Sequence, residues 1–261
     1  MGASASTSAR PSFYFIGDSI TEYGSASPGG GFISLLQSEY VRSVDMVNRG
    51  VAGYNTRMIM NHVLPTVEDE LKHQFKPSLV TLWLGANDAA LSDGPNSRQA
   101  VPLDEYRSRL ADLVNTIETH LPTRSKVLLI TPPTVIDSER TSKDRSNAAA
   151  GEYARACVQV AQAEGVAVLD VYAHINSTYS NESSRSALFV DGLHFNEHGN
   201  KVVATLIDAK IQEIFSGDEL QRFRTLQLQN FGAGVASSSE FVPSAALASL
   251  GSYLVHYFGF D

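Results

Sequence analysis

The sequence FYFIGDSIT, residues 13–21, sets the architecture that we expect for the whole chain. Its four aromatic or branched apolar residues, Phe13–Ile16, predict a strand that is buried on both faces. Gly17 permits a sharp exit from this strand, which leaves Ser19 in the open as a candidate nucleophile. Glycine, aspartate and serine also favour ordinary turns for backbone reasons, and taken alone this stretch favours the turn.

The alternation of strand and helix continues along the chain. Apolar runs predict four further strands, at residues 44–47, 79–84, 126–130 and 166–171. Apolar positions at helical spacing predict helices over residues 32–41, 103–120, 148–163 and 196–215, with one more that Asn55 or Thr56 caps. This alternation predicts an α/β fold whose five-stranded parallel sheet is covered on both faces. The polar, irregular residues 134–146 are expected to form the rim of a site.

Polar residues or glycines follow four of these strands. They are Ser19, Gly53, Asn87 and the loop 191–194, after the first, second, third and fifth strands. In a parallel sheet with helices on both faces, the ligand site lies beyond the carboxyl ends of the strands. We therefore expect these segments to meet at one edge of the sheet, and this convergence favours a functional role for Ser19 over an ordinary turn.

Together these residues offer each group that acyl transfer from an ester requires. The reaction needs a hydroxyl nucleophile, a base, a group that orients the base and hydrogen-bond donors for the oxyanion. Ser19 would attack, His194 would take and return the proton, and Asp191 would fix the tautomer of the ring. The backbone amides of Ser19 and Gly53 and the side-chain amide of Asn87 would form the oxyanion hole. Taken singly, a helix cap at Asn87 and a turn at Gly53 are the simpler interpretations.

Two other classes of protein compete with this interpretation. Residues 194–198 read HFNEH and match the H-x-x-E-H signature of a group of zinc proteases. That site needs both histidines on one helix, whereas Asn196 is the natural N-cap and leaves His194 outside the helix. The zinc hypothesis also leaves Ser19 without a role. The second alternative is a binding module that keeps an acyl or carbohydrate pocket without turnover.

Composition and charge restrict the substrate and the partners. With 261 residues, 43% hydrophobic and 18% charged, the chain can bury the core of one α/β domain. We place this domain at residues 12–216, between a flexible tail, 1–11, and an extension of unknown role, 217–261. The net charge of -8 argues against binding to nucleic acid or anionic lipid and favours a neutral small-molecule substrate. The single cysteine, Cys157, excludes an intramolecular disulfide and is expected in the core.

The two ends of the chain suggest a compartment. The first ten residues contain no apolar run, so we expect no secretory signal peptide and a cytoplasmic protein. Met1-Gly2 with Ser6 fits the loose N-myristoylation pattern, but one acyl chain without a basic patch binds membranes only weakly. Residues 241–260 contain no Asp, Glu, Lys or Arg, yet they are too polar for a convincing membrane span. We expect this segment to pack on the domain or on a partner subunit, which leaves a homo-oligomer open.

The same residues carry a resemblance to a known family. Four segments resemble, in the family's order, the four sequence blocks of the GDSL, or SGNH, hydrolases, namely residues 17–21, Gly53, residues 85–88 and residues 191–194. Other segments are similar to the branch of isoamyl acetate-hydrolysing esterases, namely Asn48–Gly50 with Gly53–Arg57, Gly151–Ala154 and Val168–Asp170. The similarity covers residues 12–215, and Ile20 stands where the family name has leucine.

The resemblance implies a fold, a mechanism and a substrate class. The expected fold is a flavodoxin-like three-layer sandwich around a five-stranded parallel sheet. Ser19, Asp191 and His194 are expected to be catalytic through a covalent acyl-serine intermediate, without a metal or another cofactor. The expected activity is that of a serine esterase, a carboxylic ester hydrolase that acts on small neutral esters with short acyl chains such as acetate.

Overall fold

Five parallel strands form the centre of the protein in the computed structural model, which describes residues 10–26 and 30–224. The strands are β1 (Ser12–Gly17), β2 (Asp45–Gly50), β3 (Leu79–Trp83), β4 (Lys126–Ile130) and β5 (Ala167–Leu169). They lie in the order β2-β1-β3-β4-β5, which is the order of flavodoxin-like folds. The predicted parallel sheet is confirmed, and each strand overlaps one of the predicted apolar runs.

Strand β1 shows why its sequence lacks a polar face. Phe13 and Phe15 pack into the apolar cluster on one side of the sheet, whereas Tyr14 and Ile16 pack into the cluster on the other side. All four side chains are at most 1% exposed. Strand β1 lies between two other strands, and helices cover both faces of the sheet. Its side chains are therefore buried on both faces, which requires a continuous apolar run.

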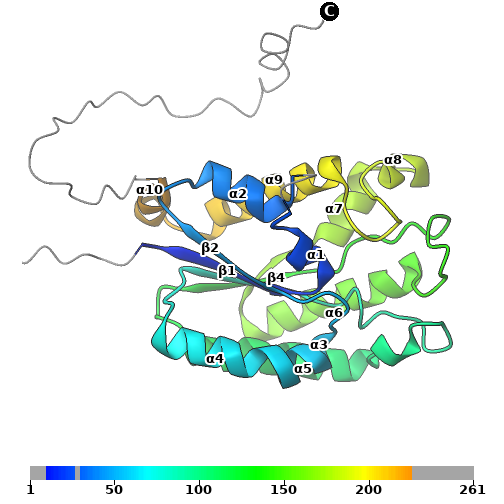
Figure 1. The fold of residues 1–261 in the computed structure, drawn as a ribbon, viewed down its shortest axis with the longest axis horizontal. Coiled ribbons are helices and arrows are strands. Elements are labelled where there is room, and N and C mark those ends of the chain that lie inside the picture. Colours follow the sequence, from blue (N-terminus) through cyan, green and yellow to red (C-terminus); the bar gives the residue numbers. More distant parts are fainter. Residues whose placement is uncertain (1–9, 27–29, 225–261) are drawn as a thin grey trace, which may run out of the picture. The chain divides into compact units, whose positions relative to one another are not determined.

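Two layers of helices cover the sheet (Figure 1). The helices on one face are α2 (Phe32–Glu39), α7 (Val171–Thr178), α9 (Glu197–Ile214) and α10 (Gly217–Arg224). The helices on the other face are α4 (Leu64–His73), α5 (Leu103–Glu118) and α6 (Asn147–Glu164). The shorter helical segments are α1 (Ser19–Tyr23), α3 (Thr56–Met58), η1 (Ile59–Val63), η2 (Ser97–Gln99) and α8 (Glu182–Ser186). The result is the expected three-layer arrangement.

Strand β2 is longer than its sequence predicts. Residues 48–50, which follow the strand predicted at residues 44–47, pair with the end of β1 in parallel register, up to Gly17 opposite Gly50. As an edge strand, β2 has partly exposed side chains and a short apolar run, although its backbone pairing continues. The loop toward Gly53 therefore begins only after Gly50.

Helices α7 and α8 are absent from the sequence prediction. The carboxylate of Asp170 caps α7 by accepting a hydrogen bond from the backbone N–H of Ala173 at 2.9 Å. The side-chain oxygen of Asn181 caps α8 by accepting one from the backbone N–H of Ser184 at 2.8 Å. Such short helices depend on their caps more than on an apolar stripe, so hydrophobic periodicity does not detect them.

Helix α10 lies beyond residue 216, where we expected the packed domain to end. Its Phe223 is buried and contacts the rings of Phe13 and Phe215 edge to face, at centroid distances of 5.1 and 4.9 Å. The packed structure thus reaches Arg224. Residues 1–9, which carry the N-myristoylation pattern, and the segment 241–260 lie outside the described residues. In the described part of the chain, no helix is long and apolar enough to cross a membrane.

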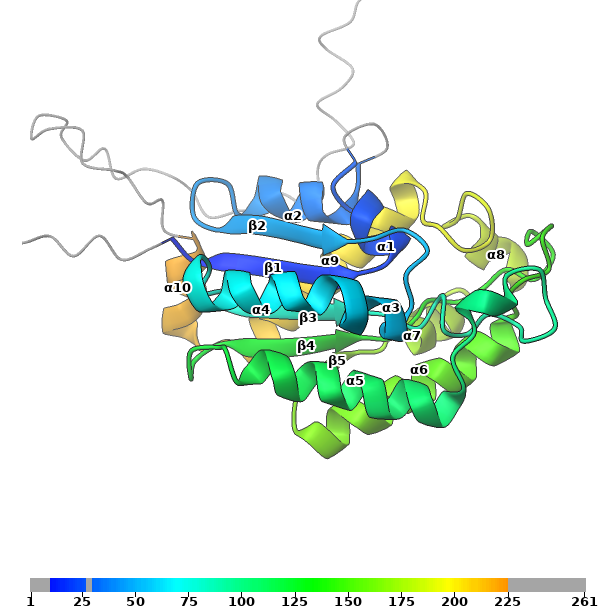
Figure 2. The same cartoon turned by 60° about the horizontal axis from the view of Figure 1, so that its bottom comes forward.

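The carboxyl ends of the strands lie at one edge of the sheet, because all five strands are parallel. The short helices α1 and α3 follow β1 and β2 at this edge (Figure 2). The chain leaves β1 for a neighbour on one side, β2, and later returns to a neighbour on the other side, β3. Doubly wound sheets bind their ligands at such a switch point.

Candidate active site

Ser19 is the first residue of α1, directly after the turn that leaves β1. Asp18 caps this helix, since its carboxylate accepts a hydrogen bond from the backbone N–H of Ile20 at 2.9 Å. Gly17 is required, because a Cβ atom there would lie 2.1 Å from the hydroxyl of Thr21. Ser19 is only 8% exposed, less open than we expected, and its hydroxyl is engaged by a histidine ring.

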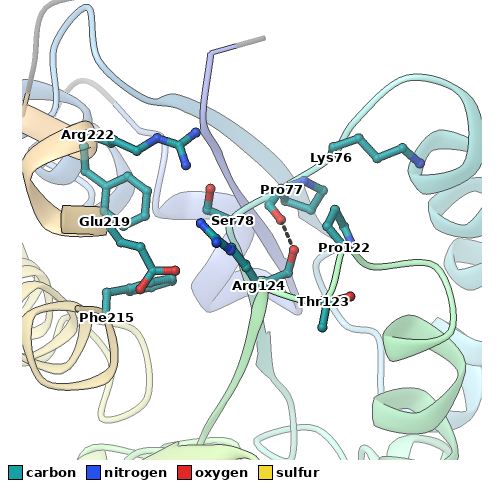
Figure 3. A pocket seen from close by; sticks show the side chains of 11 residues that line it. Lys76, Pro77, Ser78, Pro122, Thr123, Arg124, Phe215, Glu219 and Arg222 are labelled. Atoms are coloured by element: carbon teal, nitrogen blue, oxygen red, sulfur yellow. Dashed lines mark hydrogen bonds between the residues drawn. The ribbon is translucent and has the colours of Figure 1, made fainter. Parts of the chain in front are cut away.

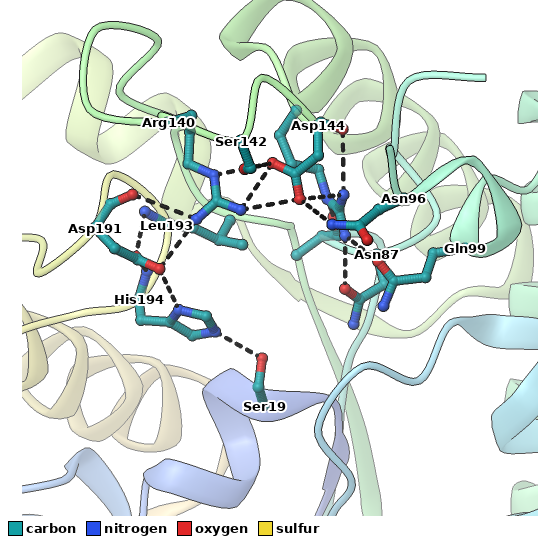
Figure 4. A network of polar contacts seen from close by, with 12 residues as sticks. Ser19, Asn87, Asn96, Gln99, Arg140, Ser142, Asp144, Asp191, Leu193 and His194 are labelled. Carbon is teal, nitrogen blue, oxygen red and sulfur yellow. Dashed lines mark hydrogen bonds and ion pairs between the residues drawn. The ribbon is translucent and has the colours of Figure 1, made fainter. Parts of the chain in front are cut away.

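His194 and Asp191 form a chain of hydrogen bonds with Ser19 (Figure 4). The Nε2 atom of His194 lies 2.8 Å from the Oγ of Ser19, and its Nδ1 atom lies 3.0 Å from Oδ2 of Asp191. The other carboxylate oxygen of Asp191 accepts hydrogen bonds from the backbone N–H groups of Leu193 and His194, at 3.0 and 2.8 Å. These bonds fold the loop back on itself, which explains how a spacing of three residues places a carboxylate beside the ring.

The carboxylate of Asp191 stays ionised in this loop. Burial would raise its pKa, but hydrogen bonds from the ring and the backbone of His194 hold the pKa well below its usual range. Arg140 adds a further donor, with Nη1 at 3.0 Å from Oδ2 of Asp191. Gly192 permits the turn, because its φ is +77° and a Cβ atom there would lie 2.8 Å from the carbonyl oxygen of Ile136. An ionised carboxylate at Nδ1 favours the tautomer whose Nε2 accepts a proton.

Asn87 and Gly53 come from the loops that follow β3 and β2. The side-chain nitrogen of the buried Asn87 donates a hydrogen bond to the carbonyl of Tyr54 at 2.8 Å, and its Oδ1 accepts one from Nη2 of Arg145 at 2.8 Å. The nitrogen thus points away from the guanidinium group, toward the side where Ser19 lies (Figure 4). An amide nitrogen carries two hydrogens, so one remains for an oxyanion. Gly53 has a φ of +80°, which a side chain would strain.

Two carboxyl groups are buried beneath the site. Burial raises the pKa of Asp18 to about 7 and that of Asp88 to about 6, although hydrogen bonds to each carboxylate oppose the shift. Asp88 accepts hydrogen bonds from the backbone N–H and the hydroxyl of Thr56, at 3.0 and 2.5 Å. It thereby joins the loop after β3 to the loop after β2 and holds Asn87 and Gly53 in register.

We expect Asp18→Asn to remove one source of pH dependence from the stability of the fold. The pKa of Asp18 is about 7 in the folded protein, against an ordinary value of 3.8. As the pH rises through this window, the unfolded chain loses its proton first, so the free energy of unfolding falls. Asparagine does not ionise, and its side-chain oxygen can still accept from Ile20. The melting temperature of the variant relative to wild type should therefore be higher at about pH 8 than at about pH 4. An equal difference at both pH values would contradict this expectation.

The predicted site residues meet at one edge of the sheet, namely Ser19, Gly53, Asn87, Asp191 and His194. The two histidines of the H-x-x-E-H segment do not share a helix. His198 is exposed in the first turn of α9, whereas His194 precedes Asn196, the cap of that helix. Among the described residues, no group of three or more histidine, cysteine, aspartate or glutamate side chains is arranged to hold a metal ion.

Other polar residues of the site have no counterpart in the sequence prediction, namely Gln99, Arg140, Asp144 and Arg145. Three of them lie in the segment 134–146, whose polar character after β4 predicted the rim of a site but did not indicate the contacts of these residues. Burial alone would raise the pKa of Asp144, but hydrogen bonds from hydroxyl, amide and guanidinium groups hold it well below its usual range. The hydrogen bonds of Arg140, Asp144 and Arg145 link Asp191 to Asn87 (Figure 4).

A hollow of about 440 Å³ lies elsewhere, near the amino ends of β3 and β4 (Figure 3). Ser78 and Ser125, which directly precede these strands, line it together with Phe215 and residues of α10. Exposed basic residues, Lys76 and Arg124 among them, also line it. None of the predicted site residues lines this hollow, so it is separate from the site around Ser19.

The fold and this arrangement of side chains define a class of enzyme. A model of the GDSL-like Lipase/Acylhydrolase family matches residues 15–202, which include Ser19 and His194. The chain belongs to this family and is a carboxylic ester hydrolase. The isoamyl acetate-hydrolyzing esterase 1 homolog of Mus musculus is 36% identical to it, over 81% of this chain and 87% of the relative. A GDSL esterase/lipase of Arabidopsis thaliana is 33% identical, over 80% of this chain and 89% of the relative. The family resemblance of the sequence is confirmed.

Solved structures share the fold. An acetylxylan esterase from Geobacillus stearothermophilus superposes with a TM-score of 0.61 at 23% identity, over 77% of this chain and 94% of that chain. A lipase/acylhydrolase from Enterococcus faecalis superposes with a TM-score of 0.59 at 25% identity, over 78% of this chain and 96% of that chain. The expected SGNH hydrolase fold is confirmed.

Proposed function

We propose that this enzyme hydrolyses small neutral esters with short acyl groups through an acyl-serine intermediate. The observation that carries the mechanism is the hydrogen-bonded chain from Ser19 through His194 to Asp191, with contacts of 2.8 and 3.0 Å. A hydroxyl, an imidazole and an ionised carboxylate in this order supply a nucleophile, its base and the group that orients the base. This order supports covalent catalysis at Ser19.

In the first half of the reaction, His194 takes the proton of Ser19 as the serine oxygen attacks the carbonyl carbon of the ester. The carbonyl oxygen becomes an oxyanion, which the N–H groups of Ser19 and Gly53 and the amide of Asn87 stabilise. The bond to the alcohol then breaks, and His194 gives its proton to the departing oxygen. In the second half, His194 deprotonates a water molecule that attacks the acyl group, and Ser19 regains its proton as the acid leaves.

Three observations support the proposed substrate class. The Mus musculus relative is named for the hydrolysis of isoamyl acetate, a small neutral ester with an acetyl group. The net charge of -8 disfavours anionic substrates. At the site, the exposed ring of Tyr23 lies 5.6 Å from the ring of His194. This ring offers an apolar surface to one arm of a small ester.

A series of p-nitrophenyl esters with acetyl, butyryl and octanoyl groups tests the substrate class. All three share the leaving group, so differences in kcat/KM report on the acyl part alone. We expect kcat/KM to be highest for the short acyl groups and to fall by about tenfold or more for octanoyl. A rise of kcat/KM with acyl length would contradict the proposal. A protein that cleaves none of the three esters would place its substrate outside this class and would also contradict the proposal.

A further inference from the structure

The reaction described above leaves three charged residues of the site without a role. Arg140, Asp144 and Arg145 lie in the segment between β4 and α6. The side chain of Asp144 is 1% exposed, that of Arg145 is 3% exposed and that of Arg140 is 12% exposed. Burial of charged groups is costly unless they are paired and hydrogen-bonded. The bonds that these three residues form lead to both sides of the site.

Arg145 holds the segment that carries Asn87. Its Nε donates a hydrogen bond to the carbonyl of Ala86 at 2.6 Å, and its Nη2 donates one to Oδ1 of Asn87 at 2.8 Å. Its Nη1 lies 3.0 Å from the carboxylate of Asp144. A guanidinium group has donors only, so it pairs with the oxygen of the Asn87 amide and not with the nitrogen. The nitrogen of Asn87 is thereby directed to where the reaction needs a donor.

The orientation of this amide matters because its two ends have nearly the same shape and opposite polarity. If the side chain of Asn87 turned over, it would present its oxygen to the developing oxyanion in place of an N–H group. The partial negative charge of the amide oxygen would then face the oxyanion in the transition state. Since the oxyanion forms only during the reaction, the loss would appear in kcat rather than in substrate binding.

The same guanidinium group reaches the second predicted oxyanion donor through Gln99. Nη2 of Arg145 lies 2.7 Å from Oε1 of Gln99, whose Nε2 donates a hydrogen bond to the carbonyl of Gly53 at 2.9 Å. Gln99 can form both bonds in only one orientation of its amide, because Arg145 must face the oxygen. One arginine therefore constrains both Asn87 and Gly53.

Asp144 anchors this arginine to the catalytic carboxylate (Figure 4). Arg140 donates through Nη2 to both carboxylate oxygens of Asp144, at 2.8 and 3.0 Å. Through Nη1 it reaches Oδ2 of Asp191 at 3.0 Å. A single buried carboxylate thus connects the arginine at the oxyanion side with the arginine at the Asp191 side, and paired charges of this kind fix geometry strongly.

The geometry points to Arg145 as a positioning residue of the oxyanion hole, anchored through Asp144 and Arg140 to Asp191. Arg145 does not touch the reacting atoms and acts through Asn87 and through Gln99. The inference rests on the proposed acyl-transfer function. It adds the residue that directs the nitrogen of the Asn87 amide, rather than its oxygen, toward the oxyanion.

A double-mutant cycle tests the link between Arg145 and Asn87. Arg145→Lys keeps a positive charge opposite Asp144 but lacks the planar group that spans Asn87 and Gln99. On an acetate ester we expect Arg145→Lys to lower kcat about tenfold or more, with KM changed by less than about twofold. Asn87→Ala should lower kcat roughly 10²-fold. In the Asn87→Ala background, Arg145→Lys should lower kcat by a clearly smaller factor than in wild type, because the amide that Arg145 orients is gone.

Arg109→Met is the matched control. In the described part of the chain, the half-buried Arg109 of α5 pairs with Glu105 at 2.7 Å and contacts the sulfur of Met60 at 3.5 Å, and neither partner belongs to the network around Ser19. Its loss should leave kcat and KM within about twofold of wild type. Circular dichroism and thermal melts show whether each variant folds. If Arg145→Lys does not fold, the half-buried Gln99 serves instead, and Gln99→Met should lower kcat about threefold or more at unchanged KM.

Several outcomes would overturn the positioning role. One is a folded Arg145→Lys variant with wild-type kcat. Another is that Arg145→Lys lowers kcat by the same factor in wild type and in the Asn87→Ala background. A raised KM at unchanged kcat would place Arg145 in substrate binding instead. Ser19→Ala separates this inference from the proposed function. If Ser19→Ala stays active, the acyl-serine function fails whatever Arg145 does. If Ser19→Ala is inactive while Arg145→Lys and Gln99→Met match wild type, only the positioning role fails.

Discussion

Ser19→Ala is expected to abolish ester hydrolysis while the protein still folds. The hydroxyl of Ser19 is the proposed nucleophile, and alanine has no oxygen that could carry the acyl group. Alanine favours the helical conformation at the start of α1. Among the described residues, the substitution removes one side-chain hydrogen bond, to His194 at 2.8 Å. Turnover of an acetate ester measures the loss, and covalent labelling by a fluorophosphonate should occur in wild type and be absent from the variant.

Residual turnover above about one part in a thousand would count against covalent catalysis at Ser19. The labelling carries separate information, since neither a zinc hydrolase nor an inert binding module reacts with a serine-directed fluorophosphonate. Wild-type protein that cleaves esters without being labelled would therefore sink the acyl-serine mechanism. Ser38→Ala, at an exposed serine of α2, is the matched control and should keep both activity and labelling.

His194→Ala is expected to be nearly inactive, whereas His198→Ala should keep kcat/KM within about tenfold of wild type. His194 bridges Ser19 and Asp191, while His198 is exposed in the first turn of α9 and lies outside this chain of hydrogen bonds. Asp191→Asn should also be severely impaired, because an amide favours the wrong tautomer of the ring. In serine proteases the corresponding change costs about 10⁴-fold in kcat.

Esterase activity and metal content of the two histidine variants together decide between the serine and zinc hypotheses. A zinc site needs both His194 and His198, so loss of either ligand would remove metal and activity. His198→Gln provides a second control of similar size and polarity. An inactive, metal-depleted His198→Ala would contradict the assignment of Ser19, Asp191 and His194.

The fold could be predicted where the burial of side chains decides the local structure. Strands β1 and β3 are buried along their whole length, so apolar runs mark them in the sequence. The end of β2 carries no such mark, because residues 48–50 stay in the strand through backbone pairing with β1. Helix α8 has no buried residue and depends on the cap at Asn181. Where backbone pairing or a helix cap determines the local structure, the hydrophobic pattern of the sequence does not reveal it.

The candidate site could be predicted in part for a related reason. Ser19 and Asn87 follow strands, and the topology of a parallel sheet brings strand ends together whatever the loops do. Arg145 belongs to an irregular segment, and its contacts with Asn87 and Gln99 span 58 and 46 positions of the chain. Such contacts depend on the detailed course of two loops. The sequence therefore predicted a polar rim but not the contacts of Arg145 with Asn87 and Gln99.

Ser19 and His194 are separated by 175 positions of the chain, which affects when the site can form during synthesis. Synthesis proceeds from the amino end, so Ser19 leaves the ribosome long before its base. A nascent chain that ends before residue 194 lacks the histidine that we propose as the base, even if β1, β2 and β3 have already paired. In the proposed mechanism, esterase activity therefore arises only after the loop that carries His194 and helix α9 have docked on the sheet.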